Sequence, residues 1–162
     1  MSDVTKELLD ETQGYVEQAK AKAAKAKKPW QTWLDAEWGF RNHWYPASLS
    51  RDLGEGDSKG IELLGEEILV TRQEGKIRAL EDRCPHRGIR FSSRPLFYTK
   101  ETLTCWYHTW TFDIEDGNLR TILSSPDSKM IGKCSLKVYP VEERKGVIFI
   151  FVGDIEPPPL HY

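Results

Sequence analysis

Short apolar stretches separated by turn residues dominate the chain from about residue 47 onward. Residues 67–72 and 76–80 are rich in Ile, Leu and Val, and they flank Gln73-Glu74-Gly75. Two such runs around a glycine-containing turn are typical of a β-hairpin. We therefore predict that these two stretches pair as antiparallel strands.

The same pattern of short strands continues toward the C-terminus. The longest strongly apolar run, Val147 to Val152, is predicted to be a buried strand. The other expected elements are strands at residues 102–104, 110–113, 136–139 and 146–152, with a turn at Asp116-Gly117. Short strands joined by turns predict a mainly β fold made of antiparallel sheets.

The first part of the chain has a different pattern. Val4, Leu8, Tyr15 and Ala19 recur at helical spacing, and Pro29 follows an Ala/Lys-rich stretch that favours a helix. We predict a helical arm over residues 1–37, which is either a docking arm or a solvated helix. Residues 30–46 are rich in aromatic side chains, which suggests packing against another surface.

Length and charge limit the possible functions. The chain has 162 residues, enough for one domain with a hydrophobic core, and its formal net charge of −2 gives no reason to expect nucleic acid as a partner. No apolar segment is long enough to cross a bilayer, and the first residues do not resemble a secretory signal. The expected compartment is the cytoplasm, with no membrane partner.

Two short motifs carry the candidate chemistry: Cys84-Pro85-His86 and Cys105-Trp106-Tyr107-His108. Each contributes one thiol and one imidazole. The chain has only three cysteines, so an all-cysteine site with four ligands cannot be built from it. Histidine must complete any such site. The third cysteine, Cys134, is expected to be a buried and inert thiol.

Two metal sites fit these ligands. Cys84, His86, Cys105 and His108 suit a Rieske [2Fe–2S] cluster, in which two thiolates hold one iron and two imidazoles hold the other. Two Cys and two His also suit a structural zinc. Zinc fingers usually group the cysteines in one hook and the histidines in another, whereas each loop here mixes the two. The Rieske interpretation is therefore favoured, and zinc remains the alternative.

These motifs resemble a known family. Residues 84–88 (CPHRG) and 105–112 (CWYHTWTF) are similar to the two cluster loops of Rieske non-haem iron ring-hydroxylating oxygenases. Residues 40–46 resemble the entry to their Rieske domain, and residues 139–154 resemble the strands that close it. The resemblance implies an antiparallel β-sandwich with two cluster-binding loops over residues 38–154. Residues 155–162 would lead toward a catalytic domain that this chain lacks.

The resemblance also implies a function. The whole enzyme would hydroxylate an aromatic or heteroaromatic ring with O₂ and NADH-derived electrons, delivered by a ferredoxin, an NADH-dependent reductase or both. Neighbouring oxygenase subunits would be further partners. The family's mononuclear Fe(II) site needs two His and one carboxylate. After His108 only His161 remains, so that site cannot be built here and the chain has no catalytic residue of its own.

Residues around the motifs are candidates for tuning the cluster. Trp106, Tyr107 and Trp110 are expected to shield it, together with Arg87. The cluster loops lack the extra cysteines of respiratory Rieske proteins, which implies a potential of roughly −150 mV. Arg83, Arg87, Arg90 and Arg94 are either a docking surface for an acidic partner or ordinary ion pairs with Glu81 and Asp82. Free-standing Rieske ferredoxins and zinc-stabilised binding modules remain the alternatives to an oxygenase part.

Overall fold

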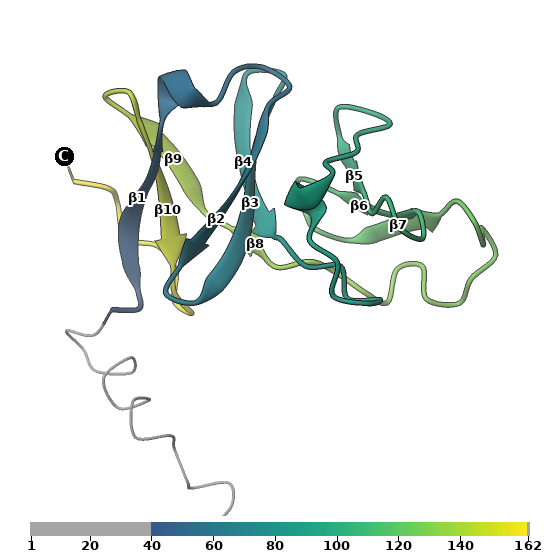
Figure 1. Cartoon of the computed structure of the whole chain (residues 1–162). Coiled ribbons are helices and arrows are strands. Elements are labelled where there is room, and N and C mark those ends of the chain that lie inside the picture. Colours follow the sequence, from purple (N-terminus) through teal and green to yellow (C-terminus); the bar gives the residue numbers. More distant parts are fainter. Residues whose placement is uncertain (1–39, 162) are drawn as a thin grey trace, which may run out of the picture. The chain divides into compact units, whose positions relative to one another are not determined.

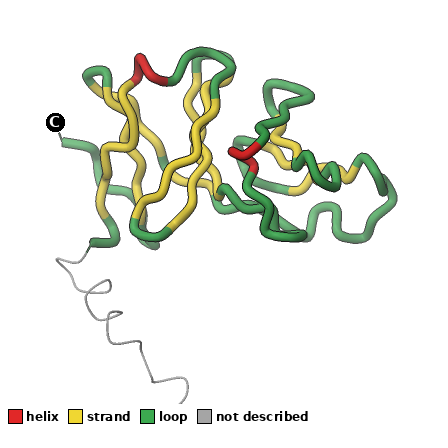
Figure 2. The backbone as a smooth tube through the Cα atoms, viewed as in Figure 1, coloured by secondary structure: helices red, strands yellow, loops and turns green. Residues whose placement is uncertain are grey.

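The computed structural model describes residues 40–161, and the predicted arm over residues 1–37 lies outside this range. Strands and loops make up almost all of the described chain, with two short 3-10 turns (Figure 2). The fold is therefore mainly β and antiparallel, as predicted. Among residues 40–161 no helix has the length and apolar character that a bilayer crossing requires.

Within residues 40–161, ten strands form three antiparallel sheets (Figure 1). The first sheet has the order β1-β10-β9, the second β2-β3-β4-β8 and the third β5-β6-β7. The bounds are β1 His43–Leu49, η1 Ser50–Asp52, β2 Ser58–Leu63, β3 Glu66–Gln73, β4 Lys76–Glu81, η2 Phe91–Ser93, β5 Thr102–Thr104, β6 Trp110–Asp113, β7 Leu119–Ile122, β8 Val138–Tyr139, β9 Val141–Arg144 and β10 Val147–Val152.

The predicted hairpin is the β3–β4 pair, with register from Ile68↔Glu81 to Gln73↔Lys76. Its turn residues, Glu74 and Gly75, have φ of 53° and 72°, as a two-residue type I′ turn requires. The Glu55 carboxylate accepts hydrogen bonds from both turn N–H groups, at 2.6 and 2.9 Å. The hairpin is thus fixed at its tip as well as along its ladder.

The hairpin separates two hydrophobic cores, because alternate side chains of a strand point to opposite faces. On one face, Ile68 and Val70 pack with β10 residues such as Ile148 and Ile150. On the other face, Leu69 and Leu80 pack with Phe112 and the rest of a cluster that includes both motif cysteines. We call these the sandwich core and the cluster-side core.

The strand β1 was missed by the hydrophobic pattern, because aromatic residues and Pro46 obscure its alternation. It pairs with the full length of β10, and its register shifts between Pro46 and Ser48. Trp44 packs edge-on against Phe151 at 5.5 Å and donates its indole N–H to the Pro158 carbonyl at 2.7 Å. The expected packing of the aromatic segment is thus observed for Trp44.

Candidate functional site

Both motifs fold into loops with the same backbone hydrogen bonds. In the first loop, the N–H of Gly88 donates to the Cys84 carbonyl at 2.7 Å, and the N–H of Cys84 donates to the Ile89 carbonyl at 2.9 Å. In the second loop, Thr109 and Trp110 take the places of Gly88 and Ile89 around Cys105, at 2.9 and 2.8 Å. Each loop therefore presents its cysteine at the same point of the same turn.

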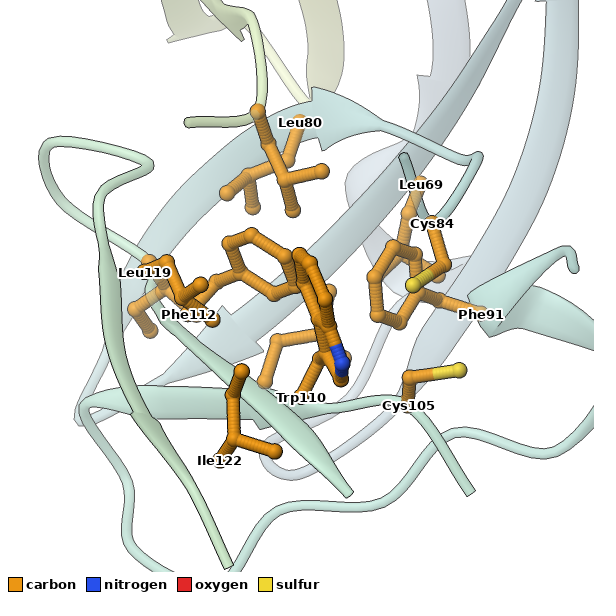
Figure 3. Close-up of a cluster of buried hydrophobic side chains, with 12 residues drawn as sticks. Leu69, Leu80, Cys84, Phe91, Cys105, Trp110, Phe112, Leu119 and Ile122 are labelled. Atoms are coloured by element: carbon orange, nitrogen blue, oxygen red, sulfur yellow. The ribbon is translucent and has the colours of Figure 1, made fainter. Parts of the chain in front are cut away.

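The two motif cysteines lie at the edge of the cluster-side core (Figure 3). Cys84 and Cys105 are each only 2% exposed, and both are free thiols. Cys84 follows β4, which ends three residues earlier at Glu81, while Cys105 comes directly after β5. The third cysteine, Cys134, was expected to be buried, and it is half-buried against the same core.

Burial and then the neighbouring Cys105 thiol raise the pKa of Cys84 to about 12. The backbone N–H groups of His86 and Arg87 act in the opposite direction, because they donate hydrogen bonds to the Cys84 sulfur. Such N–H groups favour a thiolate over a thiol. Burial outweighs these N–H groups, so the thiol is the favoured form of Cys84 without a bound cation, and a bound cation would make the thiolate favourable.

The two motif histidines lie beside each other on the solvent side of the cysteines. The rings of His86 and His108 meet edge to face with centroids 4.6 Å apart. His86 is exposed and His108 is half-buried. Desolvation first, then the nearby His108 and Arg87, lower the pKa of His86. A lowered pKa favours the neutral imidazole, which is the form that binds a metal.

The donor set consists of two pairs rather than one group of four. The thiols form a buried pair, and the imidazoles form a pair that reaches solvent. Within residues 40–161, no three Cys, His, Asp or Glu side chains converge on one point. Two pairs suit two irons with two protein ligands each. A tetrahedral zinc would need all four donors around a single ion.

The aromatic residues predicted to shield the site take different positions. Trp110 is 9% exposed, and its ring stacks on His86 at 4.9 Å with 5° between the planes. Tyr107 is 51% exposed and lies 3.9 Å from His108 between ring centroids. Trp106 is also exposed and donates from Nε1 to the Ser93 hydroxyl at 3.3 Å. Trp110 thus packs under the site, while Trp106 and Tyr107 border it at the surface.

Two of the four arginines near the first loop form ion pairs, but not with the predicted partners. Arg83 and Arg90 both bind the carboxylate of Glu67 on β3, and Arg83 Nη1 also donates to the Gly88 carbonyl at 3.2 Å. Asp82 instead accepts hydrogen bonds from the N–H and hydroxyl of Ser92. Arg87 and Arg94 are exposed.

Glu67 is therefore a residue of the site that the sequence analysis missed. The register of the hairpin could have found it. Extending the ladder one step beyond Ile68↔Glu81 sets Glu67 opposite Asp82, and the Asp82 N–H does donate to the Glu67 carbonyl at 2.9 Å. This places its carboxylate next to Arg83, the residue that precedes the first cysteine.

Comparison with known proteins finds a matching domain family and similar proteins. The model of the Rieske [2Fe-2S] domain matches residues 43–140. The chain is 52% identical over 136 residues to the carbazole 1,9a-dioxygenase terminal oxygenase component of Metapseudomonas resinovorans, covering 84% of the chain and 35% of that protein. It is 49% identical over 138 residues to the same component from a Sphingomonas species, covering 85% of the chain and 36% of the relative.

Solved structures agree as well. The terminal oxygenase of carbazole 1,9a-dioxygenase from Novosphingobium sp. KA1 superposes with a TM-score of 0.74 at 47% identity, covering 80% of this chain and 35% of the other. A reduced complex between oxygenase and ferredoxin in carbazole 1,9a-dioxygenase gives 0.73 at 52% identity, covering 82% and 34%. The chain thus spans about a third of the length of these relatives.

Proposed function

Because the chain belongs to the Rieske [2Fe-2S] domain family, we propose that it transfers single electrons through a cluster held by Cys84, His86, Cys105 and His108. The observation that carries this proposal is the arrangement of the four side chains. Two buried thiols lie beside two adjacent imidazoles, on loops with matching backbone hydrogen bonds. When bound there, the cluster supplies one-electron oxidation and reduction.

Each of the chain's own residues at the site has a proposed role. The buried Cys84 and Cys105 would hold one iron, and the N–H groups of His86 and Arg87 would support the Cys84 thiolate. His86 and His108, which are more exposed, would hold the other iron. The flat contact between Trp110 and His86 fixes the plane of that imidazole. Trp106, Tyr107 and Arg87 complete the surroundings of the site.

We further propose that the chain is the electron-transfer part of a ring-hydroxylating oxygenase α subunit. Its Rieske domain would span residues 38–154, preceded by the arm at 1–37 and followed by a linker at 155–162. The whole oxidoreductase would act on an aromatic or heteroaromatic compound, in the breakdown of such compounds. Its mononuclear Fe(II) would lie in a domain outside this chain. The identity to the carbazole relatives supports this proposal.

The proposed partners follow from the same resemblance. A ferredoxin, an NADH-dependent reductase or both would deliver electrons, and neighbouring oxygenase subunits would receive them. Solved structures of the carbazole relative in complex with ferredoxin support the first of these. The cytoplasm stays the predicted compartment. A free-standing ferredoxin is the alternative, and continuation of the reading frame past Tyr162 into a domain with a two-His, one-carboxylate set would exclude it.

Electron paramagnetic resonance of the dithionite-reduced chain tests the proposal. A rhombic signal, with average g well below that of all-cysteine [2Fe–2S] ferredoxins, is the expected result. That signal reports mixed Cys and His ligation. A colourless and silent sample with one zinc per chain would overturn the proposal and assign the four side chains to a structural site.

A further inference from the structure

Thr109, the residue after His108, has an unusual backbone conformation. Its φ is 55°, in the left-handed region. Four other non-glycine residues among residues 40–161 share this region: Asn42, Leu64, Glu74 and Lys145. Thr109 is the only β-branched one among them, and β-branched side chains are strongly disfavoured there. Strain of this kind persists where the surrounding structure gains something from the residue.

The first loop shows that this turn does not need a side chain. Gly88 occupies the matching position, with φ of 69° and the equivalent N–H bond to the cysteine carbonyl. Glycine adopts this conformation without steric cost. Threonine in the second loop is therefore the more strained choice for the same turn, and its side chain must have a separate role.

The Thr109 side chain ties the second loop to the turn that follows β7. Its hydroxyl accepts a hydrogen bond from the N–H of Ser124 at 2.9 Å. The Thr109 carbonyl accepts from the N–H of Leu123 at 3.2 Å, and the Ser124 hydroxyl donates to the carbonyl of His108 at 3.2 Å. Three hydrogen bonds, one of them to the Thr109 side chain, thus hold His108 and Thr109 against one short turn.

The two histidines are consequently held in different ways. His86 lies flat against the ring of the buried Trp110. The rings nearest His108 are tilted or perpendicular to it and belong to the exposed Tyr107 and His86. Stacking fixes the plane of His86, so the orientation of His108 depends more on its backbone.

We propose that Thr109 is a positioning residue that acts with Ser124 to fix the orientation of His108. Thr109 adopts a strained left-handed backbone conformation, and in this conformation its hydroxyl holds the loop in place beside the imidazole. The proposal rests on the proposed function, because it assumes that His108 binds the cluster. It concerns only this chain's second loop, since the first loop has no hydroxyl at the matching position.

Three variants of the chain, reconstituted with iron and sulfide, test the proposal. Thr109→Val keeps the side chain's shape but removes the acceptor for the Ser124 N–H. Thr109→Gly removes both the acceptor and the strain, so it should fold at least as readily as the wild type. Thr109→Ser keeps the hydroxyl and serves as the matched control. Each is measured by EPR line width after reduction, by the rate of iron loss to a chelator, and by urea unfolding.

Thr109→Gly and Thr109→Val should lose iron about fivefold faster than the wild type, which is the effect of one net hydrogen bond. Their EPR lines should broaden, because His108 would adopt a range of orientations, while Thr109→Ser should match the wild type. For Thr109→Gly the urea midpoint should not fall, which separates positioning from general stability.

Wild-type iron loss and line widths in Thr109→Gly would overturn the inference. In Thr109→Gly, a urea midpoint that falls in parallel with faster iron loss would also overturn it, because that would indicate a purely structural role. If Thr109→Val does not assemble a cluster, the glycine variant decides. Failure of the proposed function is distinguishable, since the wild-type chain itself would then give no mixed-ligand signal.

Discussion

The two faces of the β3–β4 hairpin carry two different kinds of core. The sandwich core lies between two sheets and consists of buried hydrophobic side chains such as Ile68, Val70 and Ile148. The cluster-side core begins in the same way, with Leu69 and Leu80, but ends in two thiols near the surface. The sandwich core is thus hydrophobic throughout, whereas the proposed cluster would complete the cluster-side core at its two cysteines.

The polar residues at the start of β3 follow the same division. Glu66 and Glu67 are neighbours that point to opposite faces. Glu66 binds Arg41, Lys137 and Tyr139, the last of which belongs to the sandwich core. Glu67 binds the two arginines around the first cysteine loop. The comparison suggests that folding stability and metal binding are largely separate properties of the two faces.

Replacing a cysteine of the cluster-side core is expected to have the largest effect on cluster assembly. Cys105→Ser should abolish the [2Fe–2S] cluster, because the buried thiolate pair would lose one member. Cys134→Ser is the matched control, since Cys134 touches the same core but is not a proposed ligand. Iron and sulfide analysis with the visible spectrum measures both. If Cys134→Ser lost the cluster and Cys105→Ser kept it, the ligand assignment would be wrong.

Replacing a histidine should change the cluster without removing it. In His108→Cys, a third thiolate would donate more charge to the outer iron, so the midpoint potential should fall by roughly 100 mV or more, toward the all-cysteine range. His43→Ala, on the distant strand β1, should leave the potential unchanged. Protein-film voltammetry measures both variants. An unchanged potential in His108→Cys would remove His108 from the ligand set.

A substitution in the sandwich core should have the opposite effect: it should lower the stability of the fold and leave the cluster unchanged. Ile148 has no exposed surface, and Ile148→Ala should lower the free energy of unfolding by about 3 kcal/mol, through lost burial and a residual cavity. The potential of the assembled cluster should not move. Leu64→Ala, at an exposed position, is the control and should change stability by less than about 0.5 kcal/mol. A shifted potential in Ile148→Ala would show that the two cores are coupled.

Sequence reasoning could predict those features that depend on local pattern. The β3–β4 hairpin follows from two apolar runs around Glu74-Gly75, and the four proposed ligands follow from the spacing within each motif. The strand β1 could not be seen, because its aromatic residues become a strand only through pairing with β10, more than a hundred residues later. Ser124 could not be assigned either, because its contacts with His108 and Thr109 depend on how the turn after β7 folds back onto the second loop. Glu67 was within reach, because the register of the predicted hairpin places it opposite Asp82.

The carboxylate of Glu66 should make the sandwich side sensitive to acid. Burial raises its pKa, but hydrogen bonds from Lys137, Tyr139 and Arg41 outweigh burial and lower the pKa from 4.5 to about 2. Burial also raises the pKa of Tyr139, so its hydroxyl keeps the proton that it donates.

A lowered carboxyl pKa contributes stability above the unfolded pKa, and this contribution is lost as the pH falls through the folded pKa. Wild-type stability should therefore fall between about pH 5 and pH 2 by about 1–2 kcal/mol, after allowance for solvent screening. Glu66→Gln should be less stable at pH 7 and should have a flatter pH profile. Urea unfolding of the cluster-free chain measures this, and parallel profiles would contradict it.

The smallest expected effect belongs to Glu67, on the cluster side. Glu67→Gln removes the negative charge shared by Arg83 and Arg90, whose side chains are about half exposed. Exposed ion pairs contribute little, so the free energy of unfolding should fall by less than about 1 kcal/mol. Because both arginines border the first loop, iron loss to a chelator should nevertheless accelerate.

Glu62→Gln is the matched control for this change, because Glu62 lies directly opposite Glu67 in the β2–β3 ladder and is exposed. It removes the same charge from the neighbouring strand without touching either arginine pair. Faster iron loss in Glu67→Gln alone would assign the effect to the ion pairs of Glu67 with Arg83 and Arg90. If both variants lost iron equally faster than the wild type, only the local charge would matter. The separation between the two faces of the hairpin would then rest on the hydrophobic contacts alone.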